Sequence, residues 1–327
     1  MELHRFGPDD EADIRRYVEL SEALRRADSP WEYPLTEREA VARVRFGWDG
    51  EPFEHYLAWH DGEVVGDAAY FAGIWDNQHL ARVHVRVAPE HRRRGHGSAM
   101  LQAMVDRARA EGRRTVGTDG WDTPAVIAFA EKQGLAQASV GVIRRQVLAD
   151  VDWAVVEALH KEAAERASAY DLVRTIGPSD PAVLPEIAEI TAAINDAPTD
   201  DLDIEDEVFP PERVARYEEV QVARGLFHRI VARHRDTGKL AGHTVVVVDA
   251  ERPEIGEQHD TSVVAAHRGH RLGVLLKTEM LLWLRETQPQ LATIDTGNAE
   301  TNDHMIGINE QLGYRVMARE LEFQRSL

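Results

Sequence analysis

The stretch His-Arg-Arg-Arg-Gly-His-Gly at residues 91–97 decides the fold, because a second version, His-Arg-Gly-His-Arg-Leu-Gly, stands at residues 267–273. An apolar stretch that favours a strand precedes each copy, at residues 83–88 and 261–266, and an apolar-periodic stretch that favours a helix follows it. Glycine lets the backbone approach a ligand closely, and the free N–H groups at the start of a helix favour an anion. Each turn is therefore predicted to bind a phosphate group.

The repeat extends beyond the two turns. Gly62 and Gly66, which indicate a hairpin turn and the strand after it, have counterparts 176 positions later at Gly238 and Gly242. The two turns are separated by the same interval, which is far longer than the repeat of a solenoid. A chain of 327 residues is long enough for two domains that each bury a core. We expect a duplicated domain.

We place the domains at residues 1–150 and 151–327, with an amphipathic connecting helix over 153–170. The expected elements of the first half are helices at 9–26, 36–45, 98–109 and 124–132, strands at 54–60, 64–71, 79–88 and 115–118, and a final strand pair that ends at 148. Those of the second half are strands at 172–176, 227–234, 240–248, 258–265, 291–296 and 314–323, and helices at 182–194, 211–223, 274–285 and 302–311. This order predicts an α+β fold, in which each half has a mixed, mainly antiparallel sheet flanked by helices.

Composition limits the possible partners. A net charge of −19 argues against nucleic acid, and the local basic turns suggest a small anionic ligand instead. The chain has no cysteine, which excludes disulfides, thiolate nucleophiles and cysteine-based metal sites. The histidines do not form a metal-binding pattern, and no apolar run has the length of a membrane span or a signal sequence. We expect a cytoplasmic protein without a membrane partner, in which the acidic run 199–207 is a solvated loop.

At this point the sequence resembles a family. The turn R/Q-x-x-G-x-G/A, followed some thirty residues later by N-x-x-A-x-x-x-Y-x-x-x-G-F, is the signature of the GNAT superfamily of acetyl-CoA-dependent N-acetyltransferases. Residues 92–97 match the turn fully, and residues 268–273 match it except that Arg271 replaces the first family glycine. The later motif is better preserved in the second half, through Asn302, Asn309 and the pair Gly313-Tyr314.

The resemblance implies how coenzyme A would bind. Its pyrophosphate would lie on the backbone amides of residues 93–98 or 269–274, and its pantetheine arm would run beside the preceding strand. The guanidinium of Arg271 would be able to pair with a cofactor phosphate. The expected cofactor-binding residues are Val263, Ala265, Arg268, Gly269, His270, Arg271, Leu272, Gly273, Val274, Asn302 and Asn309 in the second half, and Val87, Arg92, Arg93, Arg94, Gly95, His96 and Gly97 in the first.

The catalytic base is expected in the second half. Many members of the superfamily place it nine or eleven residues before the first residue of the turn, which corresponds here to His259 and Glu257. The same positions in the first half are Val83 and Ala81, which cannot take a proton, so we expect that half to be degenerate or regulatory. Strand alternation predicts that Glu257, His259, Thr261 and Val263 share one face and that Asp260 points to the other. The alternative is that Glu257 and His259 belong to a solvated strand end.

The general acid is not evident. Asn309 and Ala130 stand where the family has a tyrosine, and Tyr314 is expected in the core. The leading hypothesis is an acetyl-CoA-dependent N-acetyltransferase that acts on a small primary amine by direct transfer in a ternary complex, since no cysteine is present to carry an acyl intermediate. The alternative is a non-catalytic acyl-CoA-binding or scaffold protein. The acceptor amine and the oligomeric state stay open.

Overall fold

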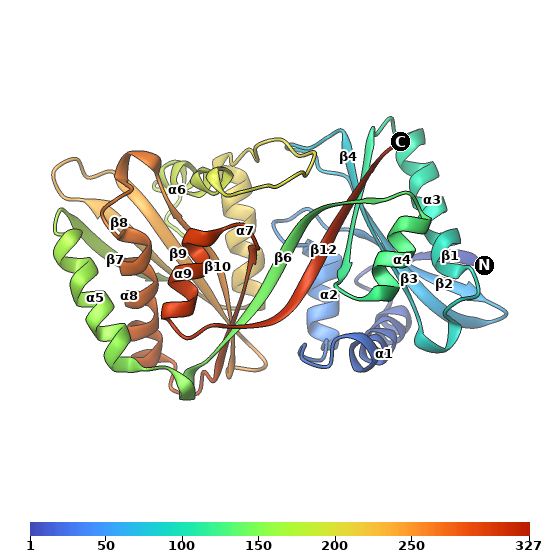
Figure 1. Ribbon diagram of the computed structural model, residues 1–327, viewed down its shortest axis with the longest axis horizontal. Helices are drawn as coiled ribbons and strands as arrows, with labels where there is room; N and C mark the ends of the chain where they lie inside the picture. Colours follow the sequence, from blue (N-terminus) through green and yellow to red (C-terminus); the bar gives the residue numbers. More distant parts are fainter. The chain divides into compact units, whose positions relative to one another are not determined.

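The computed structural model describes residues 1–327 and divides into two compact units (Figure 1). Unit 1 comprises residues 1–141, 199–206 and 318–327, and unit 2 comprises residues 142–198 and 207–317. This division differs from the expected one at residue 150. Residues 142–150 of the first half belong to unit 2, and residues 318–327 of the second half belong to unit 1.

Unit 1 is an α+β unit whose strands follow the order β1-β2-β3-β4-β5-β12. Its strands are β1 (Glu2–Phe6), β2 (Glu54–His60), β3 (Glu63–Phe71), β4 (Leu80–Val87), β5 (Thr115–Trp121) and the end of β12 (Arg315–Ser326), and its helices are α1 (Glu11–Asp28), α2 (Glu37–Phe46), α3 (His96–Ala110) and α4 (Pro124–Lys132). Strands β4 and β5 are parallel, whereas β12 runs antiparallel to β5 from Glu320 to Ser326. The last strand of the chain therefore completes the sheet of the first unit.

Unit 2 repeats this plan, with the strand order β6-β11-β10-β9-β8-β7. Its strands are the end of β6 (Ala136–Val147), β7 (Tyr170–Ile176), β8 (Gly225–His234), β9 (Leu240–Asp249), β10 (Ile255–Val263) and β11 (Thr293–Ala299), and its helices are α5 (Trp153–Arg166), α6 (Leu184–Thr191), α7 (Pro211–Arg224), α8 (Leu272–Thr287) and α9 (Asp303–Gln311). Residues 142–147 of β6 occupy in this sheet the place that β12 takes in unit 1. No helix of either unit combines the length and hydropathy of a membrane span.

Local sequence explains where the helices begin. Thr36 accepts a hydrogen bond from the backbone N–H of Glu39, whose side chain accepts one from the backbone of Thr36, so a capping box begins α2. The side chain of Asp152 caps α5, and Pro124 and Pro211 occupy first-turn positions where no N–H is needed. The predicted helices and strands are present with ends shifted by a few residues, except that the final strand pair expected up to residue 148 is the single strand β6. Strand β1 was not predicted.

The core of each unit has two layers, one on each face of the sheet. In unit 1 one layer includes Met100 and Leu101 of α3, and the other includes Ile14 and Tyr17 of α1. In unit 2 the larger layer gathers around α5 and α8, and smaller clusters lie under α6 and α7. Tyr314 belongs to the larger layer, which confirms its expected core position. Burial of these apolar faces is the main force that holds the helices on the sheets.

The acidic segment 199–206 is largely exposed, as expected, but it is also held on unit 1 by hydrogen bonds. The backbone N–H of Asp203 donates to Gln324 of β12 at 2.7 Å, and the hydroxyl of Thr115 donates to the Asp203 carboxylate at 2.8 Å. Ser139 donates to Asp200 at 2.6 Å. A segment from the second half of the sequence is thus part of the first unit.

Candidate functional site

The two glycine-bearing turns have the same backbone conformation. In unit 1, Arg93 and Gly95 have φ angles of 63° and 91°, and in unit 2 the equivalent Gly269 and Arg271 have φ angles of 84° and 59°. Gly95 and Arg271 are the residues that directly precede α3 and α8. The replacement of glycine by Arg271 therefore leaves the left-handed conformation of the turn intact, although a non-glycine residue adopts it at a cost of about 1 kcal/mol.

Both turns present unused backbone donors. The N–H groups of residues 93–98 and 269–274 donate to no backbone or side-chain acceptor of the protein. Such a run of free amides at a helix N-terminus suits a phosphate or pyrophosphate, because the helix dipole adds a favourable positive potential. By this criterion the residues present fit the pyrophosphate of coenzyme A in each unit.

The strand before each turn has an open edge. Strands β4 and β5 pair over three residues, from Leu80 to Arg82, and β10 and β11 pair over three residues, from Ile255 to Glu257. Beyond these three residues, β4 has no pairing with β5, and β10 has none with β11, up to the turn. Residues 83–87 and 258–263 have no strand partner on that edge, although the carbonyls of Val87, Gln258 and Val263 accept side-chain hydrogen bonds. This edge is the position expected for a pantetheine arm near Val87 or Val263.

The first arginine of each turn fixes the end of the preceding strand. Arg92 donates from Nε to the carbonyl of Val87 at 3.1 Å and from Nη1 to Asp28 at 2.9 Å. Arg268 donates from Nε to the carbonyl of Val263 at 3.0 Å and pairs with Asp196. Each guanidinium thus links the end of its strand to a carboxylate, and a contact of either arginine with the cofactor stays a prediction.

Arg271 has a different partner from the one expected. Its Nη1 lies 3.2 Å from the carboxylate of Glu162 on α5. The pairing of this guanidinium with a cofactor phosphate stays a prediction.

Asn302 and Asn309 differ in role. Asn302 caps α9, because its side chain accepts a hydrogen bond from the backbone N–H of Met305 at 3.2 Å. Asn309 is fully buried and donates from Nδ2 to Asn298 of β11 at 2.8 Å, while its Oδ1 has no partner. Asn309 therefore keeps a free polar atom beside the separated strands, whereas Asn302 uses its acceptor for the helix.

The remaining predicted cofactor residues are those of the turns themselves. His96 begins α3 with its ring centroid 5.0 Å from that of His60, and burial lowers the pKa of His96. The ring of His270 lies 5.8 Å from that of Tyr170. Leu272 and Val274 are buried, while Arg93, Arg94 and Gly95 are exposed. The side chains of Leu272 and Val274 thus serve the core, and their contribution to a ligand would come from the backbone.

Glu257 and His259 are brought together at the point where β10 leaves β11. The carboxylate of Glu257 lies 3.5 Å from Nε2 of His259 and 3.3 Å from Arg224 of α7. Nδ1 of His259 lies 2.6 Å from the hydroxyl of Tyr217. The side chain of His259 is 1% exposed and that of Glu257 is 45% exposed. Only Glu257 is directly accessible to a substrate, and His259 is a buried neighbour that can orient it.

A β-bulge overturns the expected facing of this strand. The register between β10 and β9 shifts between Gln258 and Thr261, so one extra residue lies on β10. Gln258 donates to Thr244 at 3.1 Å, and Thr244 contacts Thr261 at 2.7 Å. Thr261 therefore lies with Gln258, and the prediction that it shares a face with Glu257 and His259 was wrong, because the extra residue reverses the alternation.

The negative charge of Asp260, also in the bulge, acts on the Tyr217 phenol that contacts His259. Burial, and then the charge of Asp260, raise the pKa of Tyr217 well above its ordinary value. Burial also raises the pKa of Asp260. Tyr217 was not identified from the sequence, because it comes from α7, 42 positions before His259.

Unit 1 carries a different set of titratable groups at the equivalent point. Nδ1 of His84 on β4 lies 2.9 Å from Asp119 on β5. Burial opposes ionisation of Asp119, but the charge of His84 and its hydrogen bond hold the pKa of Asp119 at about 2. Burial and the charge of Asp119 raise the pKa of Glu320 on β12 to about 8. No local pattern in the sequence indicates the group of His84, Asp119 and Glu320, since β12 brings Glu320 from a distant part of the chain.

Comparisons with known proteins agree with the fold and with the turn of unit 1. Residues 19–135 match the model of the acetyltransferase (GNAT) family. This match lies within the first half of the chain. Over 99% of its length the chain matches 98% of the structure of a tandem GNAT protein from the clavulanic acid biosynthesis pathway. The TM-score is 0.79 and the identity 24%, so the chain shares the fold of that protein.

Two further relatives are informative. The structure of a GCN5-related N-acetyltransferase from Sphaerobacter thermophilus matches as well. The match covers 99% of this chain and 95% of that chain, with a TM-score of 0.66 and 16% identity, and it supports the fold. Mycothiol acetyltransferase from Stackebrandtia nassauensis is 31% identical over 146 residues, or 43% of this chain and 45% of that protein. The match therefore spans less than half the length of that curated relative.

Proposed function

We propose that the protein is an acetyl-CoA-dependent N-acetyltransferase of the cytoplasm that transfers the acetyl group directly to a small primary amine in unit 2. The observation that best supports this is Glu257, an accessible carboxylate at the point where β10 separates from β11, on the strand that leads to a turn with free amides. The proposal gives unit 1 a non-catalytic, degenerate or regulatory role toward this reaction.

The chain's residues would divide the work as follows. Acetyl-CoA, when bound, supplies the acetyl group as a thioester, and the amides of residues 269–274 would hold its pyrophosphate. Glu257 would accept the proton that the amine must lose, directly or through one water. His259, held by Tyr217, would keep the Glu257 carboxylate in place. The free Oδ1 of Asn309 offers a further polar contact beside the separated strands.

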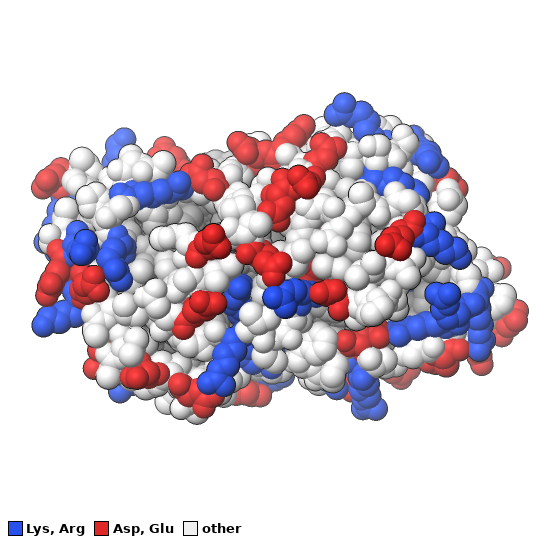
Figure 2. Space-filling view, in the orientation of Figure 1, with Lys and Arg blue, Asp and Glu red and all other residues white.

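The acceptor class is proposed from charge. The chain has 57 acidic and 38 basic residues, and Figure 2 shows acidic side chains intermixed with basic ones over the visible face. A negative overall field attracts cationic ligands. A small amine that is protonated in solution suits such a surface, and it suits a base that removes the proton at the site. Mycothiol acetyltransferase, the curated relative, is named for an acetyl transfer.

The first test is kinetic. A panel of small primary amines is assayed with acetyl-CoA, and the best acceptor is then used with Glu257→Gln. Because a positioned base contributes about 10²- to 10⁴-fold, we expect kcat to fall at least about 100-fold and the fall to shrink at high pH, where free amine is abundant. Glu254→Gln, which changes an exposed carboxylate three residues away, is the matched control and should leave kcat unchanged. Unchanged turnover in Glu257→Gln would remove Glu257 as the base.

The second test assigns the cofactor. Coenzyme A and acetyl-CoA are titrated calorimetrically into the wild type and into separate Gly273→Glu and Gly97→Glu variants. A Cβ at Gly273 would meet its nearest neighbour, Ile308, at 3.7 Å, whereas a Cβ at Gly97 would lie 3.3 Å from Val87 and Phe129, so folding of the second variant is checked by circular dichroism. Loss of binding in Gly273→Glu supports unit 2 as the site of transfer. Loss confined to Gly97→Glu would contradict it, and binding without turnover for any amine would favour a scaffold protein.

A further inference from the structure

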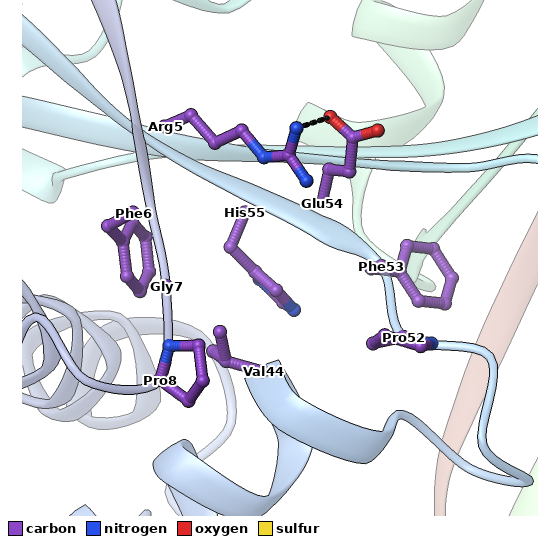
Figure 3. Close-up of a pocket in the computed structure, with 9 residues that line it drawn as sticks. All are labelled: Arg5, Phe6, Gly7, Pro8, Val44, Pro52, Phe53, Glu54 and His55. Carbon is purple, nitrogen blue, oxygen red and sulfur yellow. Dashed lines mark ion pairs between the residues drawn. The ribbon is translucent and has the colours of Figure 1, made fainter.

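Unit 1 contains a cavity of about 340 Å³ between the end of β1, the start of β2 and α2 (Figure 3). Its wall is mostly apolar, with Phe6, Pro8, Val44, Pro52 and Phe53 around it. An engineered cavity of about 150 Å³ is known to hold a benzene molecule, so this one has room for about two fused rings. It lies in unit 1 and is independent of the site proposed in unit 2.

One polar side chain, His55, points into this apolar space (Figure 3). It is 5% exposed, and neither of its ring nitrogens has a hydrogen-bond partner. The rings of Phe6 and Tyr17 lie 6.0 and 5.6 Å from it. Leaving a buried polar group unpaired costs about 1–3 kcal/mol, and a phenylalanine at this position would avoid that cost. A ligand in the cavity that forms a hydrogen bond with the imidazole would remove this cost.

The charges around the cavity favour a neutral ligand. Burial, and then the nearby Arg43 and Arg86, lower the pKa of His55 to about 3, so the ring is neutral and offers one donor and one acceptor. The same positive potential opposes a cation. At the rim, the Glu54 carboxylate is already paired with Arg5 at 3.1 Å and with Arg107 at 2.8 Å. No charged group of the wall is thus left to pair with a charged ligand.

We propose that unit 1 binds a neutral, mainly apolar small molecule in this cavity, and that His55 hydrogen-bonds to an amide or hydroxyl group on it. Strand pairing places His55, Ala69 and His84 in one row across β2, β3 and β4. Phe53, which lines the cavity, has its ring centroid 5.1 Å from that of His84. The ligand would thus lie next to the His84–Asp119 pair.

The proposal is tested by binding of defined probes. Benzamide and 1-naphthamide are titrated into the full chain carrying ¹⁵N-labelled histidine, and the imidazole resonances are followed by NMR. We expect the His55 signals to shift on saturation. Dissociation constants should rise at least tenfold in His55→Phe, which keeps the ring but removes its nitrogens, and in Val44→Trp, which fills the cavity. Val173→Trp changes an exposed valine of unit 2 and should leave binding unchanged.

Charged analogues complete the experiment. 1-Naphthoate and 1-naphthylmethylamine have the same ring system, and each should bind at least tenfold more weakly than 1-naphthamide. Absence of any His55 shift in the wild type, or equal affinity of the wild type and His55→Phe for 1-naphthamide, would overturn the proposal. The wild-type measurement holds even if a variant fails to fold. The outcome is separate from acetyl transfer in unit 2, since no acetyl-CoA is present.

Discussion

Lys277 is a charged residue in a core position of α8. Its side chain is 2% exposed, and its ammonium lies 5.2 Å from the ring centroid of Tyr314. The equivalent residue of unit 1 is Leu101, which is also buried. Burial lowers the pKa of Lys277 from 10.5 to about 7, so the unfolded chain binds more protons than the folded chain between these two pH values. The free energy of unfolding should therefore rise with pH across that range.

We predict that Lys277→Leu stabilises the protein by about 3 kcal/mol at pH 7, with a smaller gain at pH 9, because the penalty for burying the charge is removed. Urea unfolding at pH 6, 7.5 and 9 measures this. Lys161→Leu, at an exposed position, is the control and should show no such pH dependence. A loss of stability at pH 7 in Lys277→Leu would mean that the amine makes a compensating contact.

Residue-level chemistry explains how far the sequence could predict the site. The two turns were predicted because their signal is local: glycines and arginines precede a helix within a few residues. The ion pairs of Arg92 and Arg268 were not predicted, because the carboxylates of Asp28 and Asp196 are more than sixty residues away in the sequence. Tyr217 and Glu320 were missed for the same reason. A contact between residues that are far apart in the sequence produces no local pattern, so a single sequence does not predict it.

At the scale of elements, most helices and strands follow from their patterns of apolar residues, and two exceptions have clear causes. Strand β1 was missed because only Phe6 of its five residues is buried, so it carries no apolar alternation. The bulge in β10 was missed because an extra residue within the polar stretch 254–260 does not change composition. Its consequence is large, since it decides which side chains accompany Glu257.

The two helices that follow the turns should respond differently to the same substitution. A methyl group at Gly273 of α8 would have its nearest neighbour at 3.7 Å, whereas at Gly97 of α3 it would meet Val87 and Phe129 at 3.3 Å. Alanine is favoured over glycine in helices by up to about 1 kcal/mol. We predict that Gly273→Ala gains about 0.5 kcal/mol and that Gly97→Ala gains nothing or loses stability. Thermal unfolding of both variants decides this, and equal gains would contradict the tight packing at Gly97.

At the scale of the whole molecule, the exchanged strands make each unit depend on residues from the other half of the chain. Leu321 and Phe323 of β12 are each 4% exposed and belong to the core of unit 1. Burial of such side chains contributes about 1.5–3 kcal/mol each. We predict that deletion of residues 318–327 destabilises unit 1 by at least about 3 kcal/mol, because β5 also loses its partner.

Hydrogen exchange measured by mass spectrometry checks this prediction. In the deleted chain, amides of β5 should exchange much faster, while those of β9, at the centre of unit 2, should keep their protection and serve as the internal control. Unchanged exchange in β5 would show that β12 contributes little to unit 1. Fast exchange in both strands would mean that the two units unfold together.

Strand β12 also has a consequence for synthesis of the protein. During translation, residues 1–141 leave the ribosome long before residues 318–327, yet the sheet of unit 1 includes both. The sheet of the first unit therefore stays incomplete, with the edge of β5 unpaired, until β12 has been synthesised. An uncovered edge strand is a site for wrong pairing with other chains. The nascent protein should thus depend on chaperones for most of its synthesis, although each finished unit is compact.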